Sequence, residues 1–239
     1  MKNLILILFM TFILLSCFKN EEIDTQLIVY NQIPVQNGIF VNYAYHNNNY
    51  WMVLKRSNDS VISEPVLING QQVYNFFMPI DDRFVIANNE SLKVALHEDT
   101  GTPGVFEYSG SSGEDQPVNR GSLQIKDFKV RAPFISIKDQ MVNDSLAFDS
   151  LGIGYFGWLT IDKVDETEEF GKIGIAYINV AGIYRNFKVN LEEDIQAGDT
   201  LVTRLFIDQT IMQSFSEESD PPEVFNNDTI VNTVVIQNM

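Results

Sequence analysis

The sequence predicts an all-β protein, and three observations lead to that prediction. Apolar runs of five to eight residues alternate with polar residues and are separated by Asn, Gly, Asp and Pro, as in "GIFVNYAYHNNNYWMVLKR" and "GDTLVTRLFID". No long stretch keeps a helical period. The chain also resembles itself, with its two tryptophans, Trp51 and Trp158, aligned at an offset of 107 positions. A duplicated β-rich unit explains all three.

The first element along the chain is an apolar run from Leu4 to Leu15, preceded by Lys2. It is too short to span a bilayer, which takes about 20 apolar residues, and has the length of a secretory signal. The segment "LLSC" that ends at Cys17 resembles the lipobox of bacterial lipoproteins. The resemblance implies a signal peptide over residues 1–16, cleavage before Cys17 and lipidation of that cysteine. The alternative is an ordinary signal peptide with a coincidental cysteine.

A lipidated tether is expected over residues 17–25. Its charged residues, Lys19, Glu21 and Glu22, follow the cysteine closely. They resemble the signal that sends Bacteroidota-type lipoproteins to the outer face of the outer membrane. That resemblance implies a lipid-anchored protein facing the cell exterior. The alternative is a solvated charge run on a flexible tether.

The charge balance restricts the partners. The whole chain has a formal net charge of −16, and removing residues 1–16, which contain one lysine and no acid, makes it −17. Such a surface repels nucleic acid and anionic head groups, so nucleic-acid binding is excluded. The 17 Phe and 9 Tyr distinguish this acidic chain from a disordered tail and allow it a real core.

Matching segments define two units, one over residues 26–130 and one over residues 131–239. "NQ" at Asn31 matches "DQ" at Asp139. "SLKVALHED" matches "TLVTRLFID", and this match aligns His97 with Phe206. Each unit has about 100 residues and about seven strands, the size of an immunoglobulin-like β-sandwich. We expect the boundary within residues 120–133, and two separate cores joined by a short hinge.

The second unit also resembles a known family. "ISIKDQMVNDSLAFDSLGIGYFGWLTI", followed by "EEDIQAGDTLVTRLFID", is similar to an immunoglobulin-like domain of unknown function that recurs in bacterial and archaeal surface proteins. The first unit supplies the later part of that pattern in "LKVALHED" and "GTPGVFEYSGSSGEDQPV", where the second unit departs from it. The resemblance implies the fold and no catalytic residue.

Few residues suggest chemistry. The only histidines are His46 and His97, and nucleophile-elbow, phosphate-loop and zinc motifs are absent from the sequence. Because His97 aligns with a phenylalanine, we interpret it as structural. Acidic clusters at residues 162–169, 192–194 and 217–220 raise calcium as a cofactor, but none has the spacing of an EF-hand, and solvated loops explain them as well. No other metal or cofactor is expected, and the protein is predicted not to be an enzyme.

The aromatic segment "YAYHNNNYW" is the binding candidate. Strand alternation places Tyr43 and Tyr45 on one face, and a tight turn at residues 47–49 would bring Trp51 onto the partner strand. Such rings can stack on sugars or anchor a protein partner. The alternative is that they fill the sandwich core.

Two functions follow. The first is a non-enzymatic, surface-anchored interaction protein, an accessory subunit bound to an outer-membrane protein of an envelope complex. The second is a glycan-binding lipoprotein for polysaccharide capture, with Tyr43, Tyr45 and Trp51 as its platform. An enzyme, the third option, would need an active site made of carboxylates alone. The terminal strand expected over residues 229–236 either closes the second sandwich or pairs with a partner's sheet.

Overall fold

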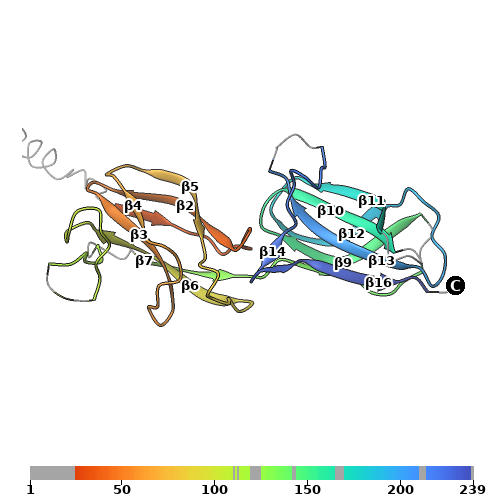
Figure 1. Ribbon diagram of the computed structural model, residues 1–239, viewed down its shortest axis with the longest axis horizontal. Helices are drawn as coiled ribbons and strands as arrows, with labels where there is room; N and C mark the ends of the chain where they lie inside the picture. The colour runs from red at the N-terminus through yellow and green to blue at the C-terminus, as the bar shows by residue number, and fades with distance from the viewer. Residues whose placement is uncertain are drawn as a thin grey trace, which may run out of the picture.

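The computed structural model describes residues 25–109, 111, 113–118, 125–141, 144–164, 170–209 and 214–237. These residues form strands, turns and loops without a helix, which confirms the all-β prediction. Two lobes lie end to end along the long axis of the molecule (Figure 1). The first is built from strands β1 to β7 and the second from β8 to β16.

Seven strands make two antiparallel sheets in the first unit: β1 (Thr25–Ile28), β2 (Gly38–His46), β3 (Tyr50–Arg56), β4 (Val66–Ile68), β5 (Val73–Pro79), β6 (Glu90–Glu98) and β7 (Ile125–Val130). One sheet has the order β1-β2-β5 and the other the order β4-β3-β6-β7. Alternate residues of both sheets, such as Val41 of β2 and Met52 of β3, are buried in one cluster between them. The unit is therefore an immunoglobulin-like sandwich of three strands on four.

The second unit repeats this arrangement with β8 (Phe134–Ser136), β9 (Ser145–Ile153), β10 (Gly157–Val164), β11 (Phe170–Ile178), β12 (Gly182–Asn190), β13 (Thr200–Ile207), β14 (Val224–Phe225), β15 (Asp228–Thr229) and β16 (Val231–Val235). Its sheets have the orders β12-β9-β8 and β11-β10-β13-β16, with β14 and β15 forming a separate hairpin. Strand β16 pairs with β13, so the terminal strand closes this sandwich.

The two units agree in register as well as in strand order. Trp51 pairs with His97 between β3 and β6, and Trp158 pairs with Phe206 between β10 and β13. The segment after β6 folds back onto it with a bridge between His97 and Pro117, and the segment after β13 does the same with a bridge between Phe206 and Pro222. The two copies predicted from the sequence thus share one backbone plan.

The Asx-Gln pair that marks each repeat has a structural role. The side-chain amide of Gln32 receives the N–H of Phe40 at 2.7 Å and donates to its carbonyl at 2.9 Å. Gln140 does the same with Ala147, at 3.0 and 2.7 Å. Each glutamine side chain pairs with the backbone N–H and C=O of one strand residue, as a neighbouring strand would. It thereby holds its own segment against β2 or β9 and satisfies backbone groups that would otherwise be left unpaired.

The expected tight hairpin between β2 and β3 is wrong. Strand β2 pairs with β1 and β5, whereas β3 pairs with β4 and β6, so residues 47–49 cross from one sheet to the other. The physical reason is burial. Both strands carry alternating apolar residues that need the same core, and an arch brings these two faces together, which a flat hairpin cannot do.

Candidate functional site

The outer face of sheet β1-β2-β5 carries an open group of tyrosines. Tyr43 of β2 and Tyr74 of β5 are direct cross-strand neighbours, with ring centroids 5.0 Å apart and planes inclined by 52°. Tyr45 lies two residues along β2 and donates a hydrogen bond to the side chain of Asn47. Tyr74 is 63% exposed, while Tyr43 and Tyr45 are half-buried. We call Tyr43, Tyr45 and Tyr74 the tyrosine face.

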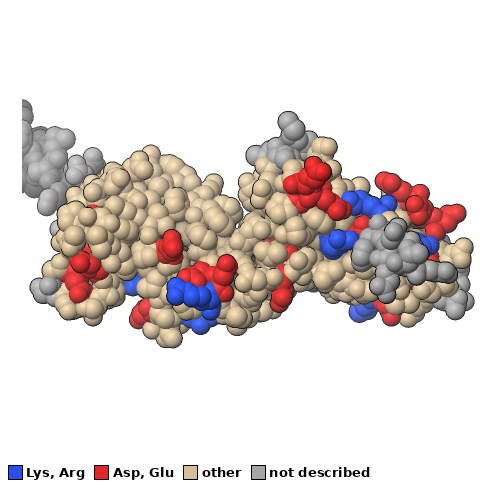
Figure 2. All heavy atoms as spheres, viewed as in Figure 1, with Lys and Arg blue, Asp and Glu red and all other residues tan. Residues whose placement is uncertain are grey.

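A second aromatic pair continues this surface toward the junction between the units. Phe40 of β2 faces Phe77 of β5 at 5.5 Å between ring centroids. Few charged side chains lie on the upper part of the first lobe in Figure 2, where Figure 1 places β2 and β5. In an acidic protein, an uncharged aromatic sheet face indicates a contact surface.

The second unit lacks these aromatic residues. Its cross-strand pair equivalent to Tyr43 and Tyr74 is Ser150 and Arg185, and the pair equivalent to Phe40 and Phe77 is Ala147 and Lys188. The equivalence is secured by a shared irregularity in the edge strand, where Asn75 has a φ of 44° and Asn186 a φ of 51°. The sandwich therefore does not need aromatic residues at these positions.

Trp51 does not join Tyr43 and Tyr45, contrary to the sequence-based prediction. It lies on β3, in the opposite sheet, and is only 7% exposed. Its indole N–H donates to Asp99 at 3.3 Å and its ring meets Phe106 edge-on, with centroids 5.6 Å apart. Trp158 meets Phe215 in the same way at 5.9 Å. Each tryptophan packs against the segment that folds back over its sheet, the segment after β6 in the first unit and after β13 in the second.

His97 lies under the same segment in the first unit and is completely buried. Its Nδ1 donates to the carbonyl of Asp115 at 3.0 Å, which leaves Nε2 to accept from the Lys55 ammonium at 2.9 Å. Burial lowers the pKa of His97 to about 4, with a further contribution from Lys55, so the ring is neutral at pH 7. Burial also lowers the pKa of Lys55, whose ammonium lies 4.6 Å from the ring centroid of Tyr108.

This pair has the geometry of a structural contact. Asp115, also buried, accepts the backbone N–H groups of Thr100, Gly101 and Glu107 and so shapes the segment that covers His97. Every polar atom of the imidazole is used in that contact. The other histidine, His46, is likewise buried and lies 2.7 Å from the hydroxyl of Thr25.

The parts of the chain that the structure describes contain no group of three or more acidic, histidine or cysteine side chains that could hold a metal ion. Several acidic residues named in the calcium prediction, those at 165–169, lie outside the described residues. Others are engaged elsewhere: Asp162 forms an ion pair with Arg204 at 3.1 Å, and Glu217 one with Lys172 at 2.8 Å.

The junction between the units is built from side chains that the sequence analysis did not single out. Val35 of the first unit is buried in the core cluster of the second, and Phe225 of the second packs against the cluster of the first. Phe40 stacks on Tyr155 at 5.9 Å, with an interplanar angle of 21°. Each unit thus completes an apolar surface of the other.

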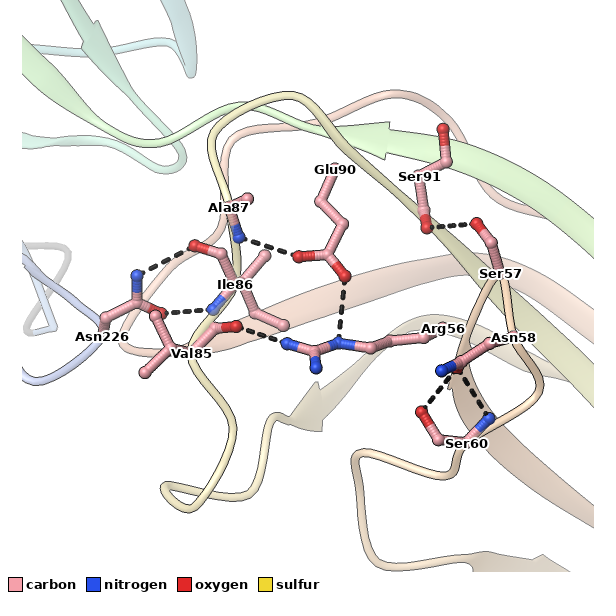
Figure 3. Close-up of polar contacts among 10 residues, drawn as sticks. All are labelled: Arg56, Ser57, Asn58, Ser60, Val85, Ile86, Ala87, Glu90, Ser91 and Asn226. Atoms are coloured by element: carbon pink, nitrogen blue, oxygen red, sulfur yellow. Dashed lines mark hydrogen bonds and ion pairs between the residues drawn. The ribbon is translucent and has the colours of Figure 1, made fainter.

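Hydrogen bonds fix the same junction. Figure 3 shows Asn226, from the turn of the β14–β15 hairpin, exchanging two hydrogen bonds with the backbone of Ile86, at 2.8 and 2.9 Å. The Ile86 segment is in turn held by an ion pair between Arg56 and Glu90 at 3.0 Å, and Glu90 also accepts the N–H of Ala87. The sequence segment "FNNDT" could have indicated this hairpin, because Asn-Asn readily adopts the positive φ values that the turn requires.

Glu223 is a buried acid at the junction. It is fully buried and accepts the N–H of Gln36 at 3.1 Å through Oε1, while Oε2 has no hydrogen-bond partner among the described residues. Burial raises the pKa of this carboxyl to about 7, against the lowering effect of the N–H groups of Gln36 and Val224. The junction therefore contains a group that titrates close to neutral pH.

The lipidation and export residues, Cys17, Lys19, Glu21 and Glu22, lie outside the described residues. Within the part that is described, no helix has the length and apolar character needed to cross a membrane.

No protein-family model matches the chain, and no curated protein matches it. Among solved structures, the BSP domain of a biofilm associated protein is similar over 90% of this chain and 29% of its own, at 9% identity and a TM-score of 0.28. The crystal structure of CBD12 from CALX1.2 is similar over 87% of this chain and 96% of its own, at 7% identity and a TM-score of 0.25. Likenesses this low carry no argument about function.

Proposed function

We propose that this chain is a non-enzymatic binding protein of the cell envelope that docks another envelope protein on its tyrosine face. The observation that supports this is the position of Tyr43, Tyr45 and Tyr74. They point out of the sandwich, and the second unit has Ser150 and Arg185 where the first has a tyrosine pair. Rings that the fold does not need, grouped on an open sheet face, are typical of protein-binding surfaces.

The shape of the tyrosine face favours a protein over a flat ligand. The Tyr43 and Tyr74 rings are inclined by 52°, so they do not form one plane on which a sugar ring could lie. Tilted rings with hydroxyl groups at their tips suit the uneven surface of a folded partner, where tyrosine supplies both apolar contact and a hydrogen bond.

The proposed location is the outer face of the outer membrane, through lipid on Cys17 and an export signal at Lys19, Glu21 and Glu22. The partner would be an outer-membrane protein, to which this chain is an accessory subunit. The net charge of −16 opposes contact with nucleic acid. Both histidines are buried in structural contacts, which supports a role without catalysis.

The alternative function, glycan capture by Tyr43, Tyr45 and Trp51, loses its largest ring. Trp51 is buried in the opposite sheet, and only the two tyrosines remain accessible. A glycan-binding protein would have to use other residues.

The test is affinity purification of the tagged full-length chain from gently solubilised outer membrane, with mass spectrometry of what co-purifies. We expect one stoichiometric integral membrane protein with the wild type and its loss with Tyr43→Ala/Tyr74→Ala. Arg185→Ala, at the position of the second unit equivalent to Tyr74, is the matched control and should retain the partner. A wild-type chain that purifies alone, or a partner retained by the double variant, would contradict the proposal.

The anchor is tested separately with Cys17→Ala. Loss of the lipid should release the protein from the membrane fraction, because the acyl chains supply the attachment, at about 0.8 kcal/mol per buried methylene. If the variant stays in the membrane fraction after a high-salt wash, the anchor is not the lipid.

A further inference from the structure

A groove runs along the junction between the two units, next to the tyrosine face but not lined by Tyr43, Tyr45 or Tyr74. Its central part has a volume of about 440 Å³. It is lined by residues of both units: Tyr30, Asn31, Gln32, Phe40, Asn42, Asn75, Gly154 and Tyr155. Flanking hollows of about 510 and 420 Å³ share lining residues with it.

The lining of the central part contains no charged side chain, in a protein with 20% charged residues. Charged groups occur only farther out, with Lys129 and Arg131 in one flanking hollow and Asp208 in the other. A groove with this lining attracts neither anions nor cations at its centre. Its occupant must therefore be uncharged there.

Amide groups supply the polar part of the lining. Asn42 uses its Oδ1 to accept the N–H of Tyr30 at 3.2 Å, which leaves its amide nitrogen as a donor. The side chain of Asn75 makes no hydrogen bond within the described residues, on a backbone that its positive φ turns out of the regular strand. Amide donors and acceptors of this kind match the hydroxyl groups of a sugar.

Aromatic rings supply the apolar part. Tyr30 is 63% exposed beside these amides. The stacked pair of Phe40 and Tyr155, one ring from each unit, lies in the same lining. A lining that combines ring faces with amides fits a ligand that has apolar C–H faces and hydroxyl edges.

The groove is formed before any ligand arrives. A side chain at Gly154 would meet the backbone oxygens of Ile33 and Pro34 at 2.4 and 2.6 Å, so the chains approach there more closely than any other residue allows. Gln32, which clamps Phe40, holds the other wall. A rigid site loses little entropy on binding.

We propose that this junction groove binds a neutral oligosaccharide, with Tyr30 as the stacking ring and Asn42 and Asn75 as the hydrogen-bonding amides. The site lies across both units, because Gly154 and Tyr155 line it together with residues of the first unit. It does not depend on the docking of a protein partner on the tyrosine face, because Tyr43, Tyr45 and Tyr74 are not among the lining residues of the groove.

The test is isothermal titration calorimetry of the full lipidated chain in a detergent without a sugar head group. The probes are cellohexaose, xylohexaose, mannohexaose and maltohexaose, with hexagalacturonate as the anionic comparison. We expect at least one neutral hexasaccharide to bind. Tyr30→Ala should weaken that binding at least about tenfold, whereas Tyr30→Phe, which keeps the ring, should retain most of it.

The matched control is Tyr74→Ala, which makes the same change at a tyrosine that is equally exposed, 63%, outside the groove. It should leave oligosaccharide binding unchanged, and Tyr30→Ala should still capture the protein partner. Thermal unfolding of each variant verifies that the fold is intact. The proposal is overturned if no neutral hexasaccharide binds at millimolar concentration, if hexagalacturonate binds best, or if Tyr74→Ala weakens binding as much as Tyr30→Ala.

Discussion

The two units of this chain share what the sandwich needs and differ in what it exposes. Gln32 and Gln140 clamp the following strand with the same pair of hydrogen bonds, and Trp51 and Trp158 meet a phenylalanine in the same edge-on geometry. By contrast, the outer face of the first unit is aromatic where the second has Ser150 and Arg185. Residues kept in both copies of one fold are explained by stability, and residues present in only one copy are candidates for function.

Truncation of the tryptophans tests the shared part of this comparison and should have the largest effect. Trp51→Ala and Trp158→Ala each remove a large ring that is 93% buried, because each indole is only 7% exposed. We expect either change to lower the free energy of unfolding by about 3–5 kcal/mol, measured by urea denaturation. If Trp51→Ala left stability unchanged and abolished binding, the indole would be a ligand contact and the comparison would fail.

The junction contains a buried carboxyl with a raised pKa, that of Glu223. Its pKa is raised from 4.5 to about 7, so between these values the folded protein keeps a proton that the unfolded chain releases. This group therefore makes the protein less stable as pH rises from about 4.5 to 7, by at most about 3 kcal/mol. Glu223→Gln, which cannot ionise, should be more stable than the wild type at pH 8.

The matched control for Glu223→Gln is Glu218→Gln, which removes the same charge from an exposed position. Chemical denaturation at pH 5 and pH 8 measures both variants. A gain in stability at pH 8 that is equal in the two variants would mean that net charge, and not burial of Glu223, is responsible.

His97 marks a difference between the two units, because the equivalent position in the second unit is Phe206. Its pKa is lowered from 6.5 to about 4, so the unfolded chain takes up a proton in that range while the folded protein does not. Its contribution to stability is lost as pH falls from about 6.5 to 4, by at most about 3 kcal/mol. This slope opposes that of Glu223.

The variant His97→Phe tests whether His97 and Glu223 change stability with pH in opposite directions. It should remove the rise in stability between pH 4 and 6.5 and leave the fall caused by Glu223, whatever it costs in absolute stability through lost contacts with Lys55 and Asp115. Denaturation at half-unit pH steps measures the slope. An unchanged slope would show that His97 is not the titrating group.

Much of the fold could be predicted from local patterns in the sequence. The alternation of apolar residues indicates strands, because it depends on residues near in sequence. The repeat is revealed by matching segments at one nearly constant offset, such as the two tryptophans 107 positions apart. The placement of Trp51 in the opposite sheet from the tyrosines could not be predicted in this way. A turn of three asparagines is compatible with a hairpin or with an arch between sheets, and only burial of the whole core decides between them.

The contacts at the junction between the two units could not be predicted from the sequence for a related reason. Val35 inserts into the second core, and Asn226 bonds to Ile86 across 140 positions, contacts that no periodicity marks. Nor could the lining of the groove be anticipated, since its residues come from separate loops and strands of both units. Only the positive-φ pair at Asn226 and Asn227 had a recognisable local signal.

The smallest expected change in stability belongs to the residues that we consider functional. Exchanging the tyrosine pair for the residues of the second unit, Tyr43→Ser with Tyr74→Arg, should alter the free energy of unfolding by no more than about 0.5 kcal/mol, since these side chains lie outside the core. The same double variant should lose the co-purifying membrane protein. The reverse exchange, Ser150→Tyr with Arg185→Tyr, should affect neither property, because the second unit lacks the aromatic surroundings of Phe40 and Phe77. If the first exchange unfolds the protein, the tyrosines are structural. If it changes neither stability nor capture, the partner binds elsewhere, and the contrast between the two outer faces is unrelated to binding.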